Sequence, residues 1–193
     1  MDSRKILEIY KLINDRSIKP VNAWPSIADI PQGALVRDAD GVVKQCRLAP
    51  GTSWQTRTSA ADNSWRGVCQ HTPTGRLVAI ADSGTGNCVM TSDDGGITWV
   101  SRVSAADNSW RGVCQHTPTG RLVAVASTGT GNRVMTSDDG GITWQTRVSA
   151  ANNNGWDSIC LHTPTGRLVA VAATGAGNRV MTSDETEKVL VKL

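Results

Sequence analysis

Short apolar runs alternate with turn-forming residues along most of the chain, and this spacing predicts β-strands. Leu122 to Ala126 are five consecutive apolar residues at the centre of a predicted buried strand, Arg121–Ser127. The turns beside it are Thr117–Gly120, with its proline and glycine, and the glycine-rich Thr128–Asn132. The other strands predicted in this stretch are Ser109–His116, Arg133–Ser137 and Ile142–Val148. Short strands about 8–12 residues apart indicate an all-β fold.

The same pattern recurs along the sequence. Residues 51–95 and 96–140 align without a gap and are identical at 36 of 45 positions. A third copy begins at Gly141, gains one residue near Asn154 and diverges after Asp184. A repeat of this length with four short strands is typical of a β-propeller blade.

The loop before the fourth strand carries the most specific motif, S-x-D-x-G-x-T-W. Its two complete copies consist of Ser92, Asp94, Gly96, Thr98 and Trp99, and of Ser137, Asp139, Gly141, Thr143 and Trp144. We expect Ser and Asp to cap backbone N–H groups, Gly to supply a positive φ, and Trp to fill the gap beside a neighbouring strand. The motif resembles the Asp-box (BNR) repeat of sialidase-like β-propellers. This resemblance covers about residues 51–184 and implies a structural role for the boxes, away from any active site.

The flanks of the repeats depart from this motif. The residues before Trp54, Arg47–Ser53, lack the aspartate, and the third box stops at Ser183-Asp184. The stretch Lys188–Leu193 could still supply a fourth strand to the third repeat.

The first 33 residues are not part of the repeat. Ile6, Ile9, Tyr10 and Ile13 follow helical spacing, which predicts an amphipathic helix over about Ser3–Asp15. Its apolar face packs either on its own domain or on a partner or second copy. The proline-containing residues 17–33 are expected to be extended. We therefore assign residues 1–33 to docking and assembly.

The predicted fold is all-β, with β-propeller blades preceded by a short helix and an extended arm. Residues 34–58 are expected to form a hairpin, Ala34–Arg37 and Val42–Cys46 around an Asp-Gly-type turn, and a partial blade. Residues 59–193 are expected to form three four-stranded blades.

Composition excludes several classes of function. A net charge of +3 is too small to indicate nucleic-acid binding. No stretch approaches the roughly 20 apolar residues that span a bilayer, and Glu8 and Lys11 interrupt the apolar residues near the N-terminus, so no signal peptide is predicted. Five cysteines, an odd number, suggest free thiols in a reducing cytosol.

An enzyme is not expected. The sialidase resemblance implies a catalytic Tyr, a Glu and an arginine triad, but the only tyrosine is Tyr10 and the only glutamates are Glu8, Glu185 and Glu187, all in the flanks. Aspartates that recur once per repeat indicate structure. No cofactor is expected, and the Cys-x-His pairs that begin at Cys69, Cys114 and Cys160 are interpreted as packing residues rather than metal ligands.

One recurrent cluster is a candidate ligand contact. Its residues are Trp65, Arg66, Trp110, Arg111 and Trp156, and the third copy has Asp157 where the other two have arginine. A Trp–Arg pair can hold a sugar face and an anionic group, but the same tryptophans could equally pack between blades.

Three blades do not close an ordinary ring, so we expect the open edges to be covered. A homodimer, a four-bladed monomer completed by residues 33–58, or copies fixed on a larger particle would each do this. Residues Ser26–Gln45 resemble segments that precede the receptor-binding parts of phage tail and virion appendage proteins. We therefore expect a virion protein made in the host cytoplasm, with other virion proteins and cell-surface glycans as partners. The alternative is a free lectin-like module.

Overall fold

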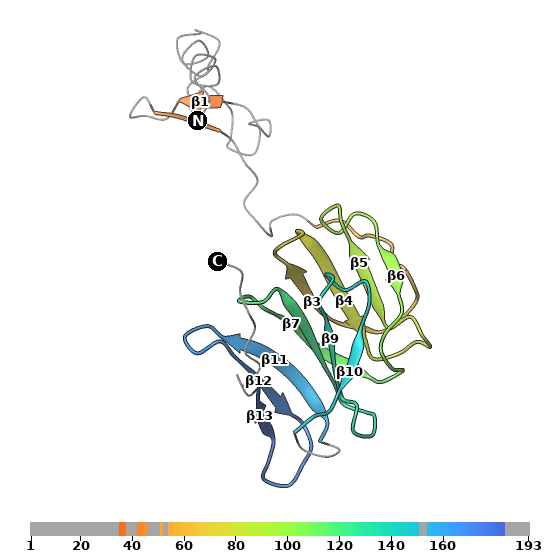
Figure 1. The fold of residues 1–193 in the computed structure, drawn as a ribbon. Coiled ribbons are helices and arrows are strands. Elements are labelled where there is room, and N and C mark those ends of the chain that lie inside the picture. The colour runs from red at the N-terminus through yellow and green to blue at the C-terminus, as the bar shows by residue number, and fades with distance from the viewer. Residues whose placement is uncertain (1–34, 38–41, 46–50, 52–53, 151–153, 184–193) are drawn as a thin grey trace. The chain divides into compact units, whose positions relative to one another are not determined.

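The computed structural model describes residues 35–37, 42–45, 51, 54–150 and 154–183 (Figure 1). The chain divides into two compact units, Met1–Gln55 and Thr56–Leu193. The predicted helix over Ser3–Asp15, the arm over residues 17–33 and the strand Lys188–Leu193 lie outside the described residues. In the part that is described, no helix has the length and apolar character needed to cross a bilayer.

The described part of the first unit is a small antiparallel hairpin. β1 (Leu35–Arg37) pairs with β2 (Val43–Gln45), with Leu35 opposite Gln45. The two strands lie within Ala34–Arg37 and Val42–Cys46, the segments that the sequence predicts to pair.

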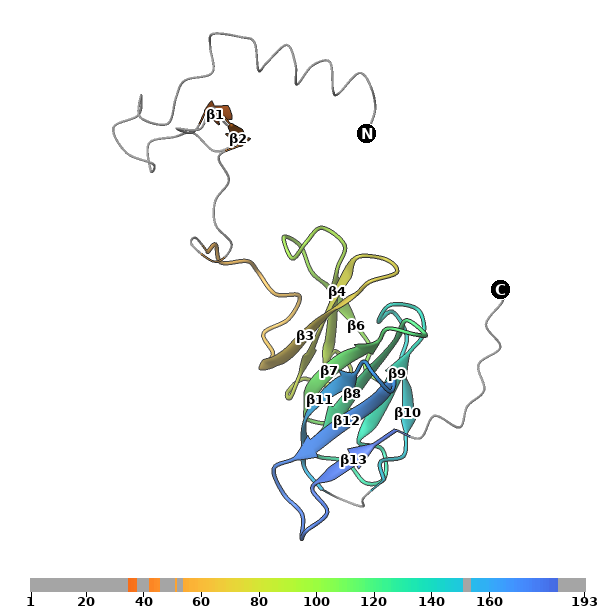
Figure 2. The ribbon, with the colours of Figure 1, turned by 90° about the vertical axis from the view of Figure 1, so that its left-hand side faces the viewer.

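The second unit contains one antiparallel sheet from each repeat (Figures 1 and 2). The first sheet consists of β3 (Trp65–His71), β4 (Arg76–Ala81), β5 (Val89–Ser92) and β6 (Val100–Arg102). The second consists of β7 (Trp110–His116), β8 (Arg121–Ala126), β9 (Val134–Ser137) and β10 (Gln145–Arg147). The third consists of β11 (Trp156–His162), β12 (Arg167–Ala172) and β13 (Val180–Thr182).

Strand order within each sheet follows chain order, so each repeat is a meander. The register is also the same, because Trp65 lies opposite Ala81, Trp110 opposite Ala126 and Trp156 opposite Ala172. These sheets confirm the all-β class and the blade architecture predicted from the repeats.

The first strands of successive sheets lie side by side. A Cβ atom on Gly67 would lie 3.1 Å from the carbonyl oxygen of Arg111, and one on Gly112 would lie 3.0 Å from the Cα of Ser158. Glycine at these two positions therefore lets the backbones of β3, β7 and β11 approach one another. In the third sheet the same position is Ser158, which lies opposite Val171 as Gly112 lies opposite Val125.

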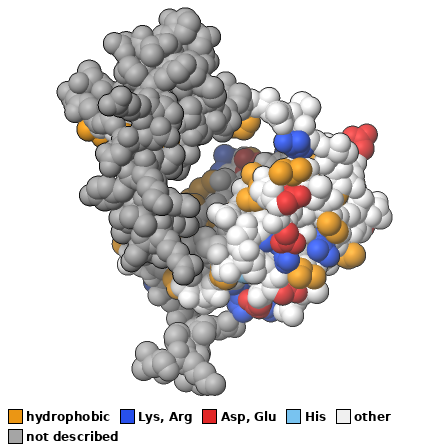
Figure 3. Space-filling view, turned by 90° about the horizontal axis from the view of Figure 1, so that it is seen from above, with side chains coloured by type: hydrophobic (Ala, Val, Ile, Leu, Met, Phe, Trp, Pro, Cys, Tyr) orange, Lys and Arg blue, Asp and Glu red, His pale blue; other side chains and the backbone are white. Residues whose placement is uncertain are grey.

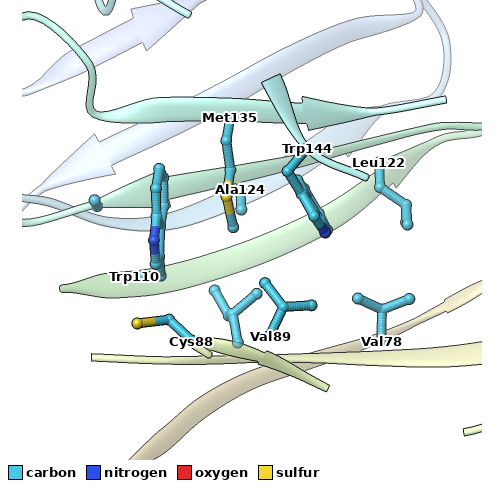
Figure 4. Close-up of a cluster of buried hydrophobic side chains, with 10 residues drawn as sticks. Val78, Cys88, Val89, Trp110, Leu122, Ala124, Met135 and Trp144 are labelled. Atoms are coloured by element: carbon cyan, nitrogen blue, oxygen red, sulfur yellow. The ribbon is translucent and has the colours of Figure 1, made fainter. Parts of the chain in front are cut away.

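The main hydrophobic core lies between the first and second sheets (Figure 4). The first sheet and the loop before β5 contribute Val78, Ile80, Cys88 and Val89, and the second sheet and its box loop contribute Trp110, Leu122, Ala124, Ala126, Met135 and Trp144. A smaller cluster of Val125, Trp156 and Ala170 lies between the second and third sheets.

The fourth strand is shorter than the sequence predicts. The expected strand Ile142–Val148 is reduced to β10, Gln145–Arg147. The N–H groups of Ile142 and Thr143 instead donate to the Asp139 carboxylate, which holds these residues in the hairpin loop.

Candidate functional site

The first box hairpin is closed by its own polar side chains. Ser92 Oγ donates to Asp94 at 2.8 Å and accepts from the Gly96 N–H at 2.8 Å. The Asp94 carboxylate accepts from the N–H groups of Ile97 and Thr98 at 3.0 and 2.9 Å, and from the Thr98 hydroxyl at 2.6 Å. The capping predicted from the motif is therefore present.

The second hairpin has the same bonds and also packs against the first sheet. Its bonded residues are Ser137, Asp139, Gly141, Ile142, Thr143 and Trp144. A Cβ atom on Gly141, whose φ is 86°, would lie 2.9 Å from a Val78 methyl group. Trp144 is 9% exposed, whereas Trp99, its equivalent in the first hairpin, is only half-buried. The two boxes thus share a conformation but differ in what they contact.

The hydrogen bonds to Asp94 make the stability of the first hairpin dependent on pH. The hydroxyl and N–H of Thr98, followed by the Ser92 hydroxyl, lower the pKa of Asp94 from 3.8 to about 2. Because the folded-state pKa lies below the unfolded one, this contribution is present above about pH 4 and is lost as the pH falls towards 2. We expect Asp94→Asn to make the free energy of unfolding less dependent on pH between about pH 4 and 2, as measured by urea denaturation at a series of pH values. Asp62→Asn, at an exposed carboxylate outside the hairpin, is the control, and a wild-type slope in Asp94→Asn would contradict the assignment.

Two of the three candidate ligand-binding tryptophans lie in the interior. Trp110 and Trp156 are fully buried, and Trp65 is half-buried. The Trp110 and Trp65 Nε1 atoms donate to the carbonyl oxygens of Ala106 at 3.0 Å and Ala61 at 3.2 Å. Since these rings pack between or beside the sheets, Trp110 and Trp156 offer no free face on which a sugar could stack.

The arginines beside these tryptophans are more accessible and meet at one carboxylate. Arg66 Nε lies 2.5 Å from Asp82 Oδ2, and Arg111 Nη1 lies 3.2 Å from the same oxygen. The Asp82 side chain is 10% exposed, whereas that of Arg66 is 47% exposed. Asp82 thus joins the arginines of two successive blades.

A groove of about 500 Å³ crosses the first strands of all three sheets. Each strand supplies three lining residues: Arg66, Gly67 and Val68; Arg111, Gly112 and Val113; Asp157, Ser158 and Ile159. Figure 3, a view of one face, shows positive and negative side chains next to one another and close to exposed hydrophobic ones. A groove that combines arginine, aspartate and apolar groups could hold a ligand with anionic and hydroxyl groups.

The repeats differ in charge at two positions, one that lines the groove and one that follows the second strand of each sheet. Asp82, Ser127 and Ala173 are equivalent, because the N–H of each donates to the carbonyl of the residue before a first strand. The position that holds Arg66 and Arg111 in the first two copies holds Asp157 in the third. The loss of the carboxylate at one position and the reversal of charge at the other are visible in the sequence, but both lie outside the S-x-D-x-G-x-T-W motif.

The histidines of the Cys-x-His pairs have structural partners. Nδ1 of His71, His116 and His162 lies 2.7–2.8 Å from a threonine hydroxyl in the adjoining turn. His116 Nε2 also lies 2.9 Å from the Gly166 carbonyl oxygen of the third sheet. Burial raises the pKa of Cys69 to about 11 and, with smaller effects of neighbouring thiols, that of Cys114 to about 12. Within the described ranges, no group of three or more His, Cys, Asp or Glu side chains could hold a metal ion.

Several aspartates of the repeats are also engaged in structural contacts. Asp93 and Asp138 pair with Arg76 and Arg121 at 2.7 and 2.6 Å. Asp107 accepts from the Gly86 N–H at 2.6 Å. The remaining residues considered for chemistry or assembly lie outside the described residues, and they are Ile6, Glu8, Ile9, Tyr10, Ile13, Glu185 and Glu187.

These features define an all-β repeat protein built from β-propeller blades. No family model matches the sequence, and no curated protein matches it. Nine chains of solved structures match. One belongs to the structure "YCF48 bound to D1 peptide", with 22% sequence identity and a TM-score of 0.40; the match covers 75% of this chain and 40% of that one. The match thus spans less than half the length of that chain.

Proposed function

We propose that this chain is a non-enzymatic structural and adhesion protein, a component of a phage virion or tail that docks through residues 1–33 and presents its blades. Its partners are further copies of the chain, other virion proteins and cell-surface glycans. The phage assignment rests on the resemblance of Ser26–Gln45 described above.

The observation that carries this proposal is the exposure of apolar side chains on the outer face of the third sheet. Val171 and Val180 are 45% and 61% exposed, whereas Ile80 and Val89, their equivalents in the first sheet, are fully buried against the second sheet. Apolar faces of this kind mark sites of association. A role as one part of a larger assembly accounts for such a face.

The use of the carboxylates supports a non-enzymatic role. A hydrolase needs a carboxyl group that is free to exchange protons with a substrate. Asp94 and Asp139 instead accept several hydrogen bonds within their hairpins, and Asp82 neutralises two arginines.

The solution mass of the purified full-length chain tests the proposal. We expect a mass above the 20.5 kDa of one chain at micromolar concentration. Val171→Glu with Val180→Glu is expected to lower this mass, because charges placed on a contact face oppose association. Val103→Glu, at a valine that is 71% exposed beyond the end of β6, is the matched control. Light scattering measures all three proteins.

Two outcomes would count against this function. A wild-type chain that is a monomer at every concentration would leave the outer face without a self-association role. A chain lacking residues 1–33 that assembles on its particle as the full chain does would remove the docking role of that segment.

The groove across the first strands favours one alternative, a free glycan-binding module. The arginines of two blades and Asp157 line this groove together. Glycan binding that survives deletion of residues 1–33, in a chain without any assembly role, would favour this alternative over the virion protein.

A further inference from the structure

A second, largely apolar groove of about 380 Å³ lies between the second and third sheets. Val123, Val125 and Val134 of the second sheet form one wall. Ile159, Leu168, Ala170, Met181, Thr182 and Ser183 of the third repeat form the other, and Val148, Ser149 and Ala150 complete the lining.

The walls of this groove repeat the surroundings of Trp144. In the core between the first and second sheets, Val78, Ile80 and Val89 face Leu122, Ala124 and Met135, and the Trp144 side chain lies among them (Figure 4). One repeat later, the same positions are Val123, Val125 and Val134, facing Leu168, Ala170 and Met181. The groove is thus the equivalent of the space that Trp144 fills.

The residues around the groove are correspondingly less buried. Leu122 and Met135 are fully buried beside Trp144, whereas Leu168 and Met181, their equivalents, are only half-buried. The position equivalent to Trp144, one repeat later, is not a tryptophan. Trp144 follows Met135 by nine residues, and the residue nine positions after Met181 is Leu190.

We propose that residues 184–193 of the same chain occupy this groove, with Leu190 in the place of Trp144 and Val191–Leu193 paired with β13 as a fourth strand. The described chain ends at Thr182 and Ser183, which themselves line the groove, so the following residues start beside it. The sequence Lys188-Val-Leu-Val-Lys-Leu193 supplies apolar side chains and β-branched residues suited to a strand. Pairing with β13 would also cover a strand edge that has no partner among the described residues.

Hydrogen exchange on the full-length chain tests this docking. We expect Leu190→Asp to reduce the protection of the Val180–Thr182 amides by at least about tenfold, because a buried charge would expel the segment from the groove. Val191→Asp is the matched control, because the equivalent of Val191 is Gln145, which is exposed. In this variant the Val180–Thr182 amides should be as protected as in the wild type. Equal protection in all three proteins would overturn the proposal.

A gain-of-stability variant separates docking from a general loss of folding. Leu190→Trp restores the residue found in the second box and is expected to raise the melting temperature by about 2–4 °C. Val191→Trp should not raise it. A rise with both variants, or with neither, would contradict the register.

The competing occupant is a second copy, which could insert its 87%-exposed Trp54. The protection of the Val180–Thr182 amides could rise with protein concentration and be unchanged by Leu190→Asp. That result would assign the site to the second copy and overturn the intramolecular proposal.

Discussion

Trp144→Ala is expected to lower the free energy of unfolding by about 3–5 kcal/mol, whereas Trp99→Ala should cost about 1 kcal/mol. The two tryptophans occupy the same position of the same motif and donate the same Nε1 hydrogen bond to a glycine carbonyl at 3.1 Å. Trp144 lies in the core between two sheets, and its removal leaves a cavity lined by Val78, Leu122 and Met135. Trp99 is half-buried beyond that core, so its site can be filled by solvent.

Urea denaturation followed by far-UV circular dichroism measures this difference, since tryptophan fluorescence changes with the substitutions themselves. Because both variants remove a tryptophan from the same position of the motif, each serves as the control for the other. Equal losses for Trp99→Ala and Trp144→Ala would mean that the box hairpin, rather than the contact between sheets, determines the stability of the blades.

Gly112→Ala is expected to destabilise the protein by about 2–3 kcal/mol. The added Cβ would lie 3.0 Å from Ser158 Cα, 3.1 Å from Ile159 N and 3.2 Å from Asp157 O. All three atoms belong to the backbone of β11, which cannot rotate away as a side chain can. The second and third sheets must therefore move apart to accommodate the methyl group.

Ser158→Ala is the control for this substitution. It lies at the same position of the next sheet, is exposed, and should change the free energy of unfolding by less than about 0.5 kcal/mol. Thermal unfolding of the full-length variants compares them directly. If Gly112→Ala melts like Ser158→Ala, the close approach of β7 and β11 does not constrain this position.

The sequence predicts the blades well because their signals are local. The run Leu122–Ala126, the Thr-Pro-Thr-Gly turns and the capping of the box by Ser92 and Asp94 all act within one repeat. The end of the fourth strand was less predictable, because Ile142 and Thr143 have β-forming side chains but give their N–H groups to Asp139.

The candidate site was harder to predict, because the burial and the contacts of a residue depend on the neighbouring sheet against which it packs. Trp110 and Trp156 are fully buried and Trp65 is half-buried, although each begins the same strand of its sheet. The bridge from Asp82 to Arg66 and Arg111 links positions 16 and 29 residues apart in the sequence, on two different sheets. Such a contact follows from the stacking of the blades and not from the motif of any one of them.

Ser158 also restricts where a further repeat could be added to the array. A duplicated copy inserted between the first two sheets would bring its own glycine at this position and could stack at the same close spacing. A copy added after the third sheet would meet the serine Cβ where Gly67 and Gly112 present none. A further copy of this blade therefore cannot stack on the third sheet at the same spacing, and whatever surface covers it must keep its backbone farther from β11 than one blade keeps from the next.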